Sequence, residues 1–275
     1  MTTLYSSVIR LTNLHRVTLR GDGGQHAHAA FHAIIHQVDP ALARYLHDEL
    51  KDKRKPFTLS PLMDLPQRKG TSEVYLREGW QCWLRATILD DKLFRTFIEY
   101  FMNPGKLPEI RLGDAHFLVS EILTTPGSHP WAGYTTLEDL QKKLDEPAPQ
   151  RIQFDLFTVT SFKLQDNKIE TMPTPKHVFG NLAGAWRQLT GENHVQPIEE
   201  YAEKNLQIAS QRLKRERTVL HNSPQLGAVG RVEFVRTDGE DSSTARALNL
   251  LADLAFYTGI GRKTAQGMGM SSRVW

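Results

Sequence analysis

The sequence predicts an α+β protein built of two tandem ferredoxin-like domains, each an antiparallel sheet with helices on one face. Its 275 residues are enough for two domains of ordinary size, each with a core of its own. In the first half, apolar alternation and helical spacing follow one another in the order strand, helix, strands, helix, strand, which suits this fold. The second half repeats the pattern, so a tandem arrangement is expected.

The first half opens with a strand and two amphipathic helices. Residues 6–11 alternate as in a strand, and glycines at 21–24 interrupt the chain before the first helix. The apolar residues of that helix recur three and four positions apart: Phe31, Ile34, Ile35 and Val38. Asp39 and Pro40 form a helix-start signal. The apolar stripe that follows repeats every fourth residue: Leu42, Leu46 and Leu50. Further elements are expected as strands at 74–76, 81–88 and 109–122 and a helix at 91–102.

The second half has its own set of expected elements. These are strands at 152–162 and 228–235 and helices at 178–189, 198–215 and 245–258. The stretch at 126–150 begins rich in Pro, Gly and Thr and becomes charged, which is typical of a junction between domains. We therefore expect an N-terminal domain at 1–125, a linker at 126–150 and a C-terminal domain at 151–275.

The composition is that of a globular protein, with 40% hydrophobic and 24% charged residues. No apolar stretch approaches the 18 residues of a membrane span, and the N-terminus lacks the pattern of a secretory signal. A cytoplasmic location without membrane contact is expected. The single cysteine, Cys82, excludes an intramolecular disulfide and a cysteine-rich zinc site, and its flanking tryptophans favour ordinary packing.

Basic residues gather in three places although the formal net charge is only +3. The three clusters are Lys51, Lys53, Arg54 and Lys55; Arg212, Lys214, Arg215 and Arg217; and Arg262 with Lys263. Phosphate contacts need such local clusters rather than a high total charge. The alternative for each cluster is a solvated face of the protein.

A glycine-rich loop at 259–269 follows the last expected helix. A dinucleotide fingerprint would need a third glycine at Thr264 and a helix afterwards, and a P-loop would need its first glycine near Phe256 or Tyr257. Glycines around two cations instead let the backbone approach a polyanion such as nucleic acid. The candidate RNA-binding residues of the loop are Gly259, Gly261, Arg262, Lys263, Gly267 and Gly269. The alternative is a glycine-rich hairpin that packs the two domains together.

The pattern Gly-apolar-Gly, five residues, Gly-apolar-Gly resembles the signature loop of the CRISPR repeat-processing endoribonucleases, the Cas6 family of the RAMP superfamily. The resemblance extends to residues 42–47, 55–60 and 110–117 and to the helix before Gly259. It implies two RAMP or RRM-like domains and cleavage of CRISPR repeat RNA in precursor transcripts to give guide RNAs. It also implies no metal requirement, no nucleotide cofactor, and contact with subunits of a CRISPR effector complex.

Two other functions remain open at this point. A catalytically silent RNA-binding RAMP subunit, a scaffold of an effector complex, would share the fold and the loop. A small-molecule enzyme could use the loop for a phosphate, but no helix follows Gly269 to help bind one. The histidines discriminate the nuclease from the scaffold, because a scaffold has no need of proton transfer.

Metal-free RNA cleavage uses the 2′-hydroxyl as nucleophile, so the protein must move two protons and stabilise a phosphorane. The products then carry a 2′,3′-cyclic phosphate and a 5′-hydroxyl. Histidine suits the proton transfers because its usual pKa of about 6.5 is near working pH. His32 lies at the flank of the first helix and His47 near the end of the second, where the helix dipole favours an imidazolium.

The family resemblance places the catalytic histidine at His47 and the catalytic lysine at Lys55, while the position of His32 often holds a proton-handling residue in the family. Because this chain has extra residues between His47 and Lys55, Lys53 and Arg54 compete for the lysine's role and are candidate RNA contacts. Which histidine is acid and which is base stays open. A metal site from His28, His32 and His36 is a further alternative, since residues four apart on a helix can share an ion.

Overall fold

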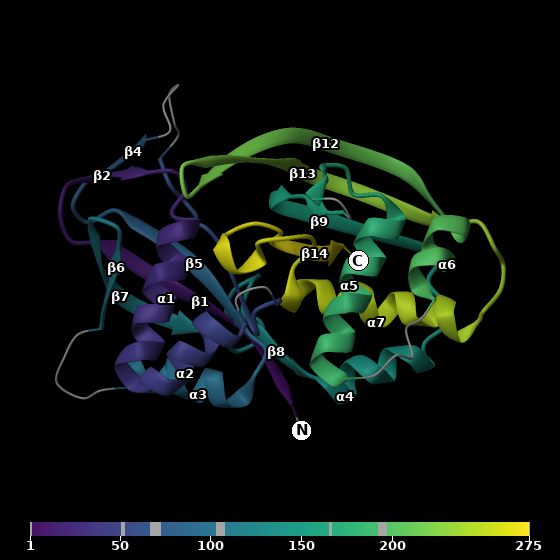
Figure 1. Ribbon diagram of the computed structural model, residues 1–275, viewed down its shortest axis with the longest axis horizontal. Helices are drawn as coiled ribbons and strands as arrows, with labels where there is room; N and C mark the ends of the chain where they lie inside the picture. The colour runs from purple at the N-terminus through teal and green to yellow at the C-terminus, as the bar shows by residue number, and fades with distance from the viewer. Residues whose placement is uncertain are drawn as a thin grey trace.

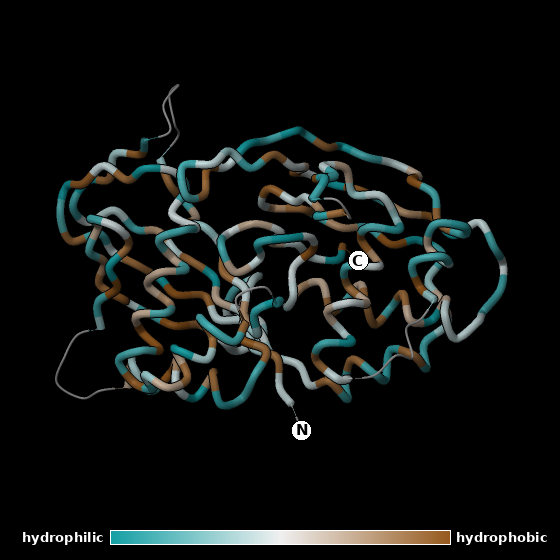
Figure 2. Tube along the Cα trace, in the orientation of Figure 1, coloured by the Kyte–Doolittle hydropathy of each residue, from teal (hydrophilic) through white to brown (hydrophobic). Residues whose placement is uncertain are grey.

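The computed structural model describes residues 2–50, 53–66, 73–102, 108–164, 167–191 and 197–274. Two domains lie side by side, and a long β-hairpin arches over both of them (Figure 1). Apolar segments lie inside each domain and polar segments outside (Figure 2). Lys51 lies outside the described residues.

The N-terminal domain is a sheet of antiparallel strands in the order β3-β5-β1-β7-β6, with β8 also paired to β1. Its strands are β1 (Thr3–Asn13), β3 (Phe57–Leu59), β5 (Gln81–Ile88), β6 (Glu109–Leu112), β7 (Ala115–Leu123) and β8 (Gly133–Thr136). A separate ribbon consists of β2 (Val17–Arg20) and β4 (Glu73–Leu76). Its helical elements are α1 (Gly24–Val38), α2 (Pro40–Arg44), the π-helical turn η1 (Tyr45–Glu49) and α3 (Asp91–Phe101).

Local signals explain where these helices begin. The Asp39 carboxylate accepts a hydrogen bond from the Leu42 amide at 2.8 Å, and Pro40 occupies the first turn of α2. Asp90 caps α3 in the same way. The apolar face of α1 then packs with that of α3 against the sheet, where the rings of Phe31 and Phe97 stack.

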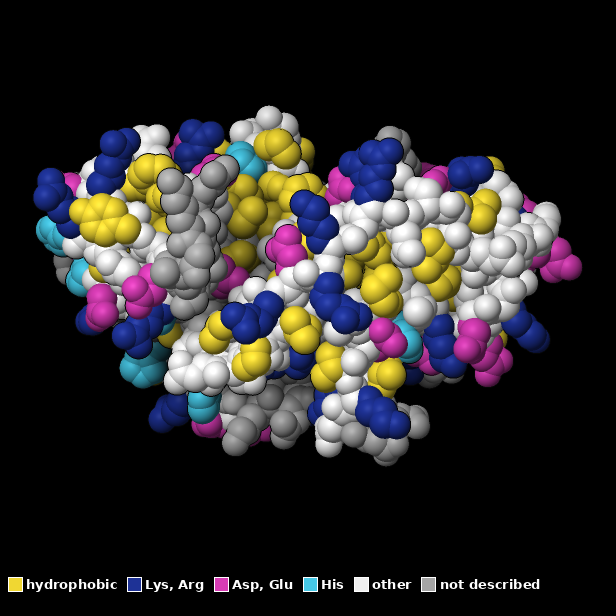
Figure 3. Space-filling view, turned by 90° about the horizontal axis from the view of Figure 1, so that it is seen from above, with side chains coloured by type: hydrophobic (Ala, Val, Ile, Leu, Met, Phe, Trp, Pro, Cys, Tyr) yellow, Lys and Arg dark blue, Asp and Glu magenta, His cyan; other side chains and the backbone are white. Residues whose placement is uncertain are grey.

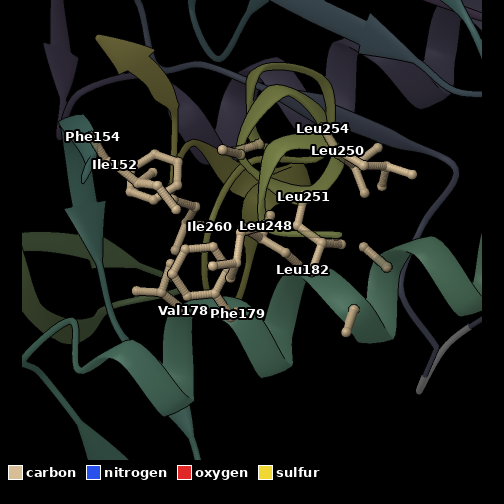
Figure 4. Packing of buried hydrophobic residues seen from close by; sticks show 14 of the residues in the cluster. Ile152, Phe154, Val178, Phe179, Leu182, Leu248, Leu250, Leu251, Leu254 and Ile260 are labelled. Atoms are coloured by element: carbon tan, nitrogen blue, oxygen red, sulfur yellow. The ribbon is translucent and has the colours of Figure 1, made fainter. Parts of the chain in front are cut away.

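The C-terminal domain has a sheet in the antiparallel order β12-β13-β9-β14. Its strands are β9 (Arg151–Thr160), β10 (Phe162–Lys163), β11 (Ile169–Glu170), β12 (Leu206–Leu220), β13 (Ser223–Arg236) and β14 (Ser271–Val274). Its helical elements are α4 (Leu137–Gln141), η2 (Lys142–Asp145), α5 (Pro175–Thr190), α6 (Ile198–Asn205), α7 (Ser243–Thr258) and η4 (Thr264–Gln266). Side chains of β9, α5 and α7 meet in one core, including Phe154, Phe179 and Leu251 (Figure 4). The two antiparallel sheets with their helices confirm the tandem ferredoxin-like prediction.

The predicted helix at 198–215 is wrong beyond Asn205. The helix α6 ends there, and the chain continues as β12, which pairs with β13 from Leu206 to Leu220. Lys, Arg and Gln favour a helix by intrinsic propensity, but that preference is small and the hydrogen-bonded ladder overrides it. The strand expected at 109–122 is likewise two strands, separated by a turn at Gly113, whose φ is 63°.

The domain limits of 1–125 and 151–275 stay a prediction, and the stretch between them is well structured. Strand β8 pairs with β1 of the first sheet. In α4, Leu140 belongs to the core of the C-terminal domain. The stretch 126–150 thus contacts both domains.

A buried arginine joins the domains. Arg85 on β5 is 3% exposed and donates to the Ser6 hydroxyl at 2.7 Å and to the Phe256 carbonyl of α7 at 2.5 Å. Its guanidinium lies 4.1 Å from the centroid of the Phe256 ring and 4.7 Å from that of Trp131. Burial lowers the pKa of Arg85 to about 9, so the group stays charged at neutral pH. Aromatic faces and acceptors replace water around this cation.

Replacing Arg85 with Ala should therefore destabilise the protein by about 3 kcal/mol, because it removes the cation–π contacts and leaves buried acceptors unpaired. Urea unfolding followed by tryptophan fluorescence measures this change. The matched control is Arg95→Ala on α3, an exposed arginine that donates to the Asp91 carbonyl, with an expected cost below about 0.5 kcal/mol. Equal costs in the two variants would contradict the role given to Arg85.

Candidate active site

The glycine-rich loop 259–269 runs from α7 to β14 and is fixed by backbone hydrogen bonds. The Gly259 amide donates to the Ala255 carbonyl at 3.0 Å and so closes α7. The amide of Ile260 donates to the Gly269 carbonyl at 2.9 Å, which joins the two ends of the loop. Asn181 on α5 accepts from the Gly261 amide at 2.9 Å. The loop is thus a defined structure before any ligand binds.

Each glycine of the loop meets a steric requirement of the protein itself. Gly259, Gly261, Gly267 and Gly269 all have positive φ, between 65° and 95°. A Cβ at Gly261 would lie 2.5 Å from the Ser161 carbonyl oxygen, and one at Gly267 would lie 3.0 Å from Gly24 Cα. These glycines are buried, so the backbone that they approach closely is the protein's own. The packing alternative raised by the sequence is therefore present in the fold, and contact of these glycines with RNA stays a prediction.

The cations next to these glycines reach a cleft between the domains. The cleft has a volume of about 490 Å³, and its cationic lining residues are Lys53, Arg54, Lys55, Lys163, Arg262 and Lys263. Among the described residues that line it, none is Asp or Glu. An opening that combines several cations with no carboxylate suits a polyanion.

The cations of the cleft are held in different ways. Arg262 donates to Gln225 at 2.6 Å and to the Ser161 hydroxyl at 3.2 Å, which fixes its guanidinium. Burial and the neighbouring Arg262 lower the pKa of Lys263. Arg54 is half-buried, and its guanidinium donates to the carbonyls of Thr258 (3.5 Å) and Asn181 (3.3 Å). Lys53 is exposed. Arg54 therefore ties the first domain to the second, whereas Lys53 is open to a ligand.

The histidines singled out by the sequence lie together beside this cleft. His28 and His32 are one turn apart on α1, with ring centroids 4.7 Å apart. The ring of His47 on η1 lies 6.3 Å from that of His32. Lys55 donates from Nζ to the Leu46 carbonyl, which brings its ammonium next to η1. The structure thus brings together His32, His47 and Lys55, which are separate in sequence.

The two candidate catalytic histidines have different surroundings. Burial, with nearby His28, Lys55 and His47, lowers the pKa of His32 to about 4, and its buried Nε2 has no hydrogen-bond partner among the described residues. His47 is open to solvent, with 76% of its side chain exposed. Its Nδ1 lies 2.8 Å from Asp48 Oδ1, and because a carboxylate accepts, Nδ1 carries the proton. One ring is therefore neutral and enclosed, while the other is exposed and oriented by a carboxylate.

The metal alternative gains no support from this geometry. In the described parts of the chain, no group of three or more His, Cys, Asp or Glu side chains is arranged to hold a metal ion. His36 is exposed on α1, apart from the ring contacts that join His28, His32 and His47.

The basic cluster at 212–217, which the sequence analysis expected on a helix, lies on the hairpin of β12 and β13. Arg212, Lys214, Arg215 and Arg217 are all exposed along β12, on both faces of the strand. Lys and Arg side chains spread along this upper side of the molecule (Figure 3). The hairpin turns at His221 and Asn222, which have φ values of 49° and 59°. The available signal was Asn222, a residue that tolerates positive φ, between two strand-compatible runs.

The tip of this hairpin rests on the N-terminal domain beside the cleft. The Thr218 hydroxyl donates to Asp22 at 2.5 Å, and the His221 amide donates to Gln25 Oε1 at 2.6 Å. His221 itself lines the cleft. The hairpin that carries the basic strand therefore reaches the rim of the cleft.

Comparison with known proteins gives the family. Residues 3–142 match the description "CRISPR Cas6 N-terminal domain", and residues 154–271 match "CRISPR-associated endoribonuclease Cas6". The chain belongs to the Cas6 family. The family resemblance seen in the sequence is thereby confirmed, and membership supports endoribonuclease activity in the processing of CRISPR repeat RNA.

Solved Cas6 structures resemble the whole chain. A "Cas6 (TTHB231) product complex" is 27% identical, with complete coverage of both chains and a TM-score of 0.79. "Thermus thermophilus Cas6 (TTHB231)" is 25% identical over 100% of this chain and 99% of the other, with a TM-score of 0.75. A "Cas6 (TTHA0078) product complex", at 20% identity, 99% and 100% coverage and a TM-score of 0.75, shares the fold. No curated protein matches the chain. Within the described residues, no helix is both long and apolar enough to span a membrane.

Replacing Gly261 with Ala should destabilise the protein by a few kcal/mol, about 2 or more, because the new Cβ meets the Ser161 carbonyl and φ is 95°. The matched control is Gly184→Ala in α5, where a Cβ has nothing within 4 Å and helix propensity should stabilise by up to about 1 kcal/mol. Thermal melting of both variants checks the pair. Similar melting temperatures would mean that the loop can relax around a side chain.

Proposed function

We propose that the chain cuts CRISPR repeat RNA in precursor transcripts by a metal-independent reaction, leaving 2′,3′-cyclic phosphate and 5′-hydroxyl ends. The observation that carries this proposal is the convergence of His32, His47 and Lys55 beside a cleft lined by cations. Two imidazoles and an ammonium are the groups that attack by a 2′-hydroxyl requires. Support also comes from a relative described as a Cas6 product complex, at 27% identity over the whole chain.

In the proposed reaction, His32 accepts the proton of the 2′-hydroxyl. Its lowered pKa keeps it neutral at working pH, and no described residue bonds to its Nε2, so the substrate could supply a partner for that atom. A nearby phosphate would raise its pKa toward working pH, which suits a general base. His47 then donates a proton from Nε2 to the leaving 5′-oxygen, with Asp48 on Nδ1 holding the ring.

Lys55 is proposed to stabilise the charge that develops on the phosphorane. Its bond to the Leu46 carbonyl holds the ammonium next to the turn that carries His47. A fixed cation at the point of charge development stabilises the transition state more than the ground state. Lys53 is exposed and lies in the same cleft, so it remains the competing lysine.

RNA binding is proposed to rest on the loop cations and the basic hairpin. Arg262 and Lys263 project from the loop, and the glycines Gly259, Gly261, Gly267 and Gly269 hold the backbone that presents them. Lys53 extends the surface on one side, while Arg54 supports it by joining the domains. The exposed cations of β12 continue the path for a phosphate backbone.

His47→Ala should slow single-turnover cleavage of a repeat RNA by about 10²-fold to 10⁴-fold, because a general acid is lost, while RNA affinity is kept. The matched control is His36→Ala, an exposed histidine of α1 that should cleave normally. A 2′-deoxy substitution just 5′ of the scissile phosphate should abolish cutting by the unmodified protein, and EDTA should have no effect. Full activity of His47→Ala, or a need for added metal, would falsify the mechanism. Tight binding without cleavage by the unmodified protein would favour the scaffold alternative.

Lys55→Ala and Lys263→Ala should separate chemistry from binding. The first variant should reduce the cleavage rate with little change in RNA affinity, since its cation acts on the transition state. The second should weaken binding and lower the salt-dependence slope by about 1, because one fewer counterion is released. Filter binding at several salt concentrations and single-turnover rates measure both, with Lys142→Ala, whose cation pairs with Asp139, as control. If Lys53→Ala slows cleavage more than Lys55→Ala, the catalytic lysine is Lys53.

A further inference from the structure

His28 is a histidine with no role in the proposed reaction, yet its ring is closely held. Its Nδ1 lies 2.9 Å from the carbonyl oxygen of Ala265 in the glycine-rich loop. Its ring stacks on Phe57 at 5.8 Å between centroids and meets the ring of His32 edge-on at 4.7 Å. The half-buried ring of His28 thus has partners on α1, on β3 and in the loop at once.

The hydrogen bond to Ala265 determines the tautomer of His28. A carbonyl oxygen only accepts, so Nδ1 of His28 carries the proton and Nε2 does not. Burial lowers the pKa of His28, which keeps the ring neutral near pH 7. The ring is therefore held in one orientation by a directional bond, and it forms one wall of the space around His32.

The same bond lies at the contact between the loop and α1. A Cβ on Gly24, at the start of α1, would lie 2.6 Å from the Gln266 carbonyl oxygen, so the loop backbone rests directly on the helix. One turn further along, His28 holds the neighbouring Ala265 carbonyl. Lys263, two residues before Ala265, is a proposed RNA contact, and His32 follows His28 by one turn.

We propose that His28 is a positioning residue, whose Nδ1–H bond to Ala265 fixes His32 relative to the RNA-binding loop. This inference rests on the proposed function. His28 acts through two neighbours: the loop carbonyl sets its ring, and its ring sets that of His32. The geometry of proton transfer at His32 is thereby set by the same loop that holds the phosphate backbone.

Two amide substitutions test this proposal because they place the same amide group at different distances from the backbone of residue 28. In His28→Asn the amide nitrogen occupies the position of Nδ1 and can donate to Ala265, whereas in His28→Gln it occupies the position of Nε2 and cannot. We expect His28→Asn to cleave within about threefold of the unmodified protein. His28→Gln should lose on the order of 10²-fold in single-turnover rate at unchanged RNA affinity, as a displaced proton-transfer group does.

Several outcomes would overturn the proposal. The first is a retained cleavage rate in His28→Gln with a reduced rate in His28→Asn, which would indicate an RNA contact through Nε2. The second is an equal cleavage rate in the two variants. The third is a loss of RNA affinity that matches the loss of cleavage rate. Thermal melting shows that both variants fold. Should either fail to fold, ¹⁵N NMR of histidine in the unmodified protein still decides, because the absence of a Nδ1–H tautomer at His28 excludes the bond. Failure of the proposed function is distinct: in that case the unmodified protein does not cleave, or His47→Ala cleaves fully.

Discussion

The structure depends on the close approach of one loop to the backbones of two domains. Residues of the loop and its exit each enter a different apolar cluster: Ile260 the core of the C-terminal domain, Ala265 the core of the N-terminal domain, Met268 a cluster with the hairpin, and Met270 one with Trp131. Such contacts require backbone-to-backbone distances that only glycine permits at the intervening positions. The spacing of the glycines is therefore set first by packing between domains. The same packing determines the positions of the loop cations Arg262 and Lys263.

Cations on the open faces of the sheets and cations in the cleft have different hydrogen-bond partners. Some cations on the open faces of the two sheets have carboxylate partners, such as Arg231 with Asp155 and Arg10 with Glu121. In the cleft, Arg54 and Arg262 donate instead to carbonyls and neutral side chains, as Arg262 does with Gln225. Neutral acceptors hold a guanidinium in place without cancelling its charge, so the field in the cleft stays available to an anion. The enclosed His32 keeps a neutral ring in that same field.

Sequence patterns predicted most of the fold and part of the site, for identifiable reasons. Helices with apolar spacing and a strong start, such as the one that Asp39 and Pro40 begin, were found because their signals are local. Strand β12 was missed because its residues are mostly exposed and polar, so its only strong determinant is a partner strand that lies further along the chain. The carbonyl partner of His28 was invisible for a similar reason. Ala265 is far from His28 in sequence, and every residue has a backbone carbonyl, so the identity of residue 265 does not show that its oxygen accepts this hydrogen bond.

The residues that line the cleft come from segments that are distant in sequence. They therefore reach their final positions at different times during synthesis of the chain. His28 and Lys55 are in place once the first domain has folded, because α1 and β3 belong to its core. Domains generally fold as units during synthesis, the N-terminal one first. Yet Lys263 and the Ala265 carbonyl arrive only after α7, and the loop is anchored by β14 pairing with β9. A nascent chain on the ribosome would therefore hold its histidines for some time before the loop cations that we propose as RNA contacts are in place beside them.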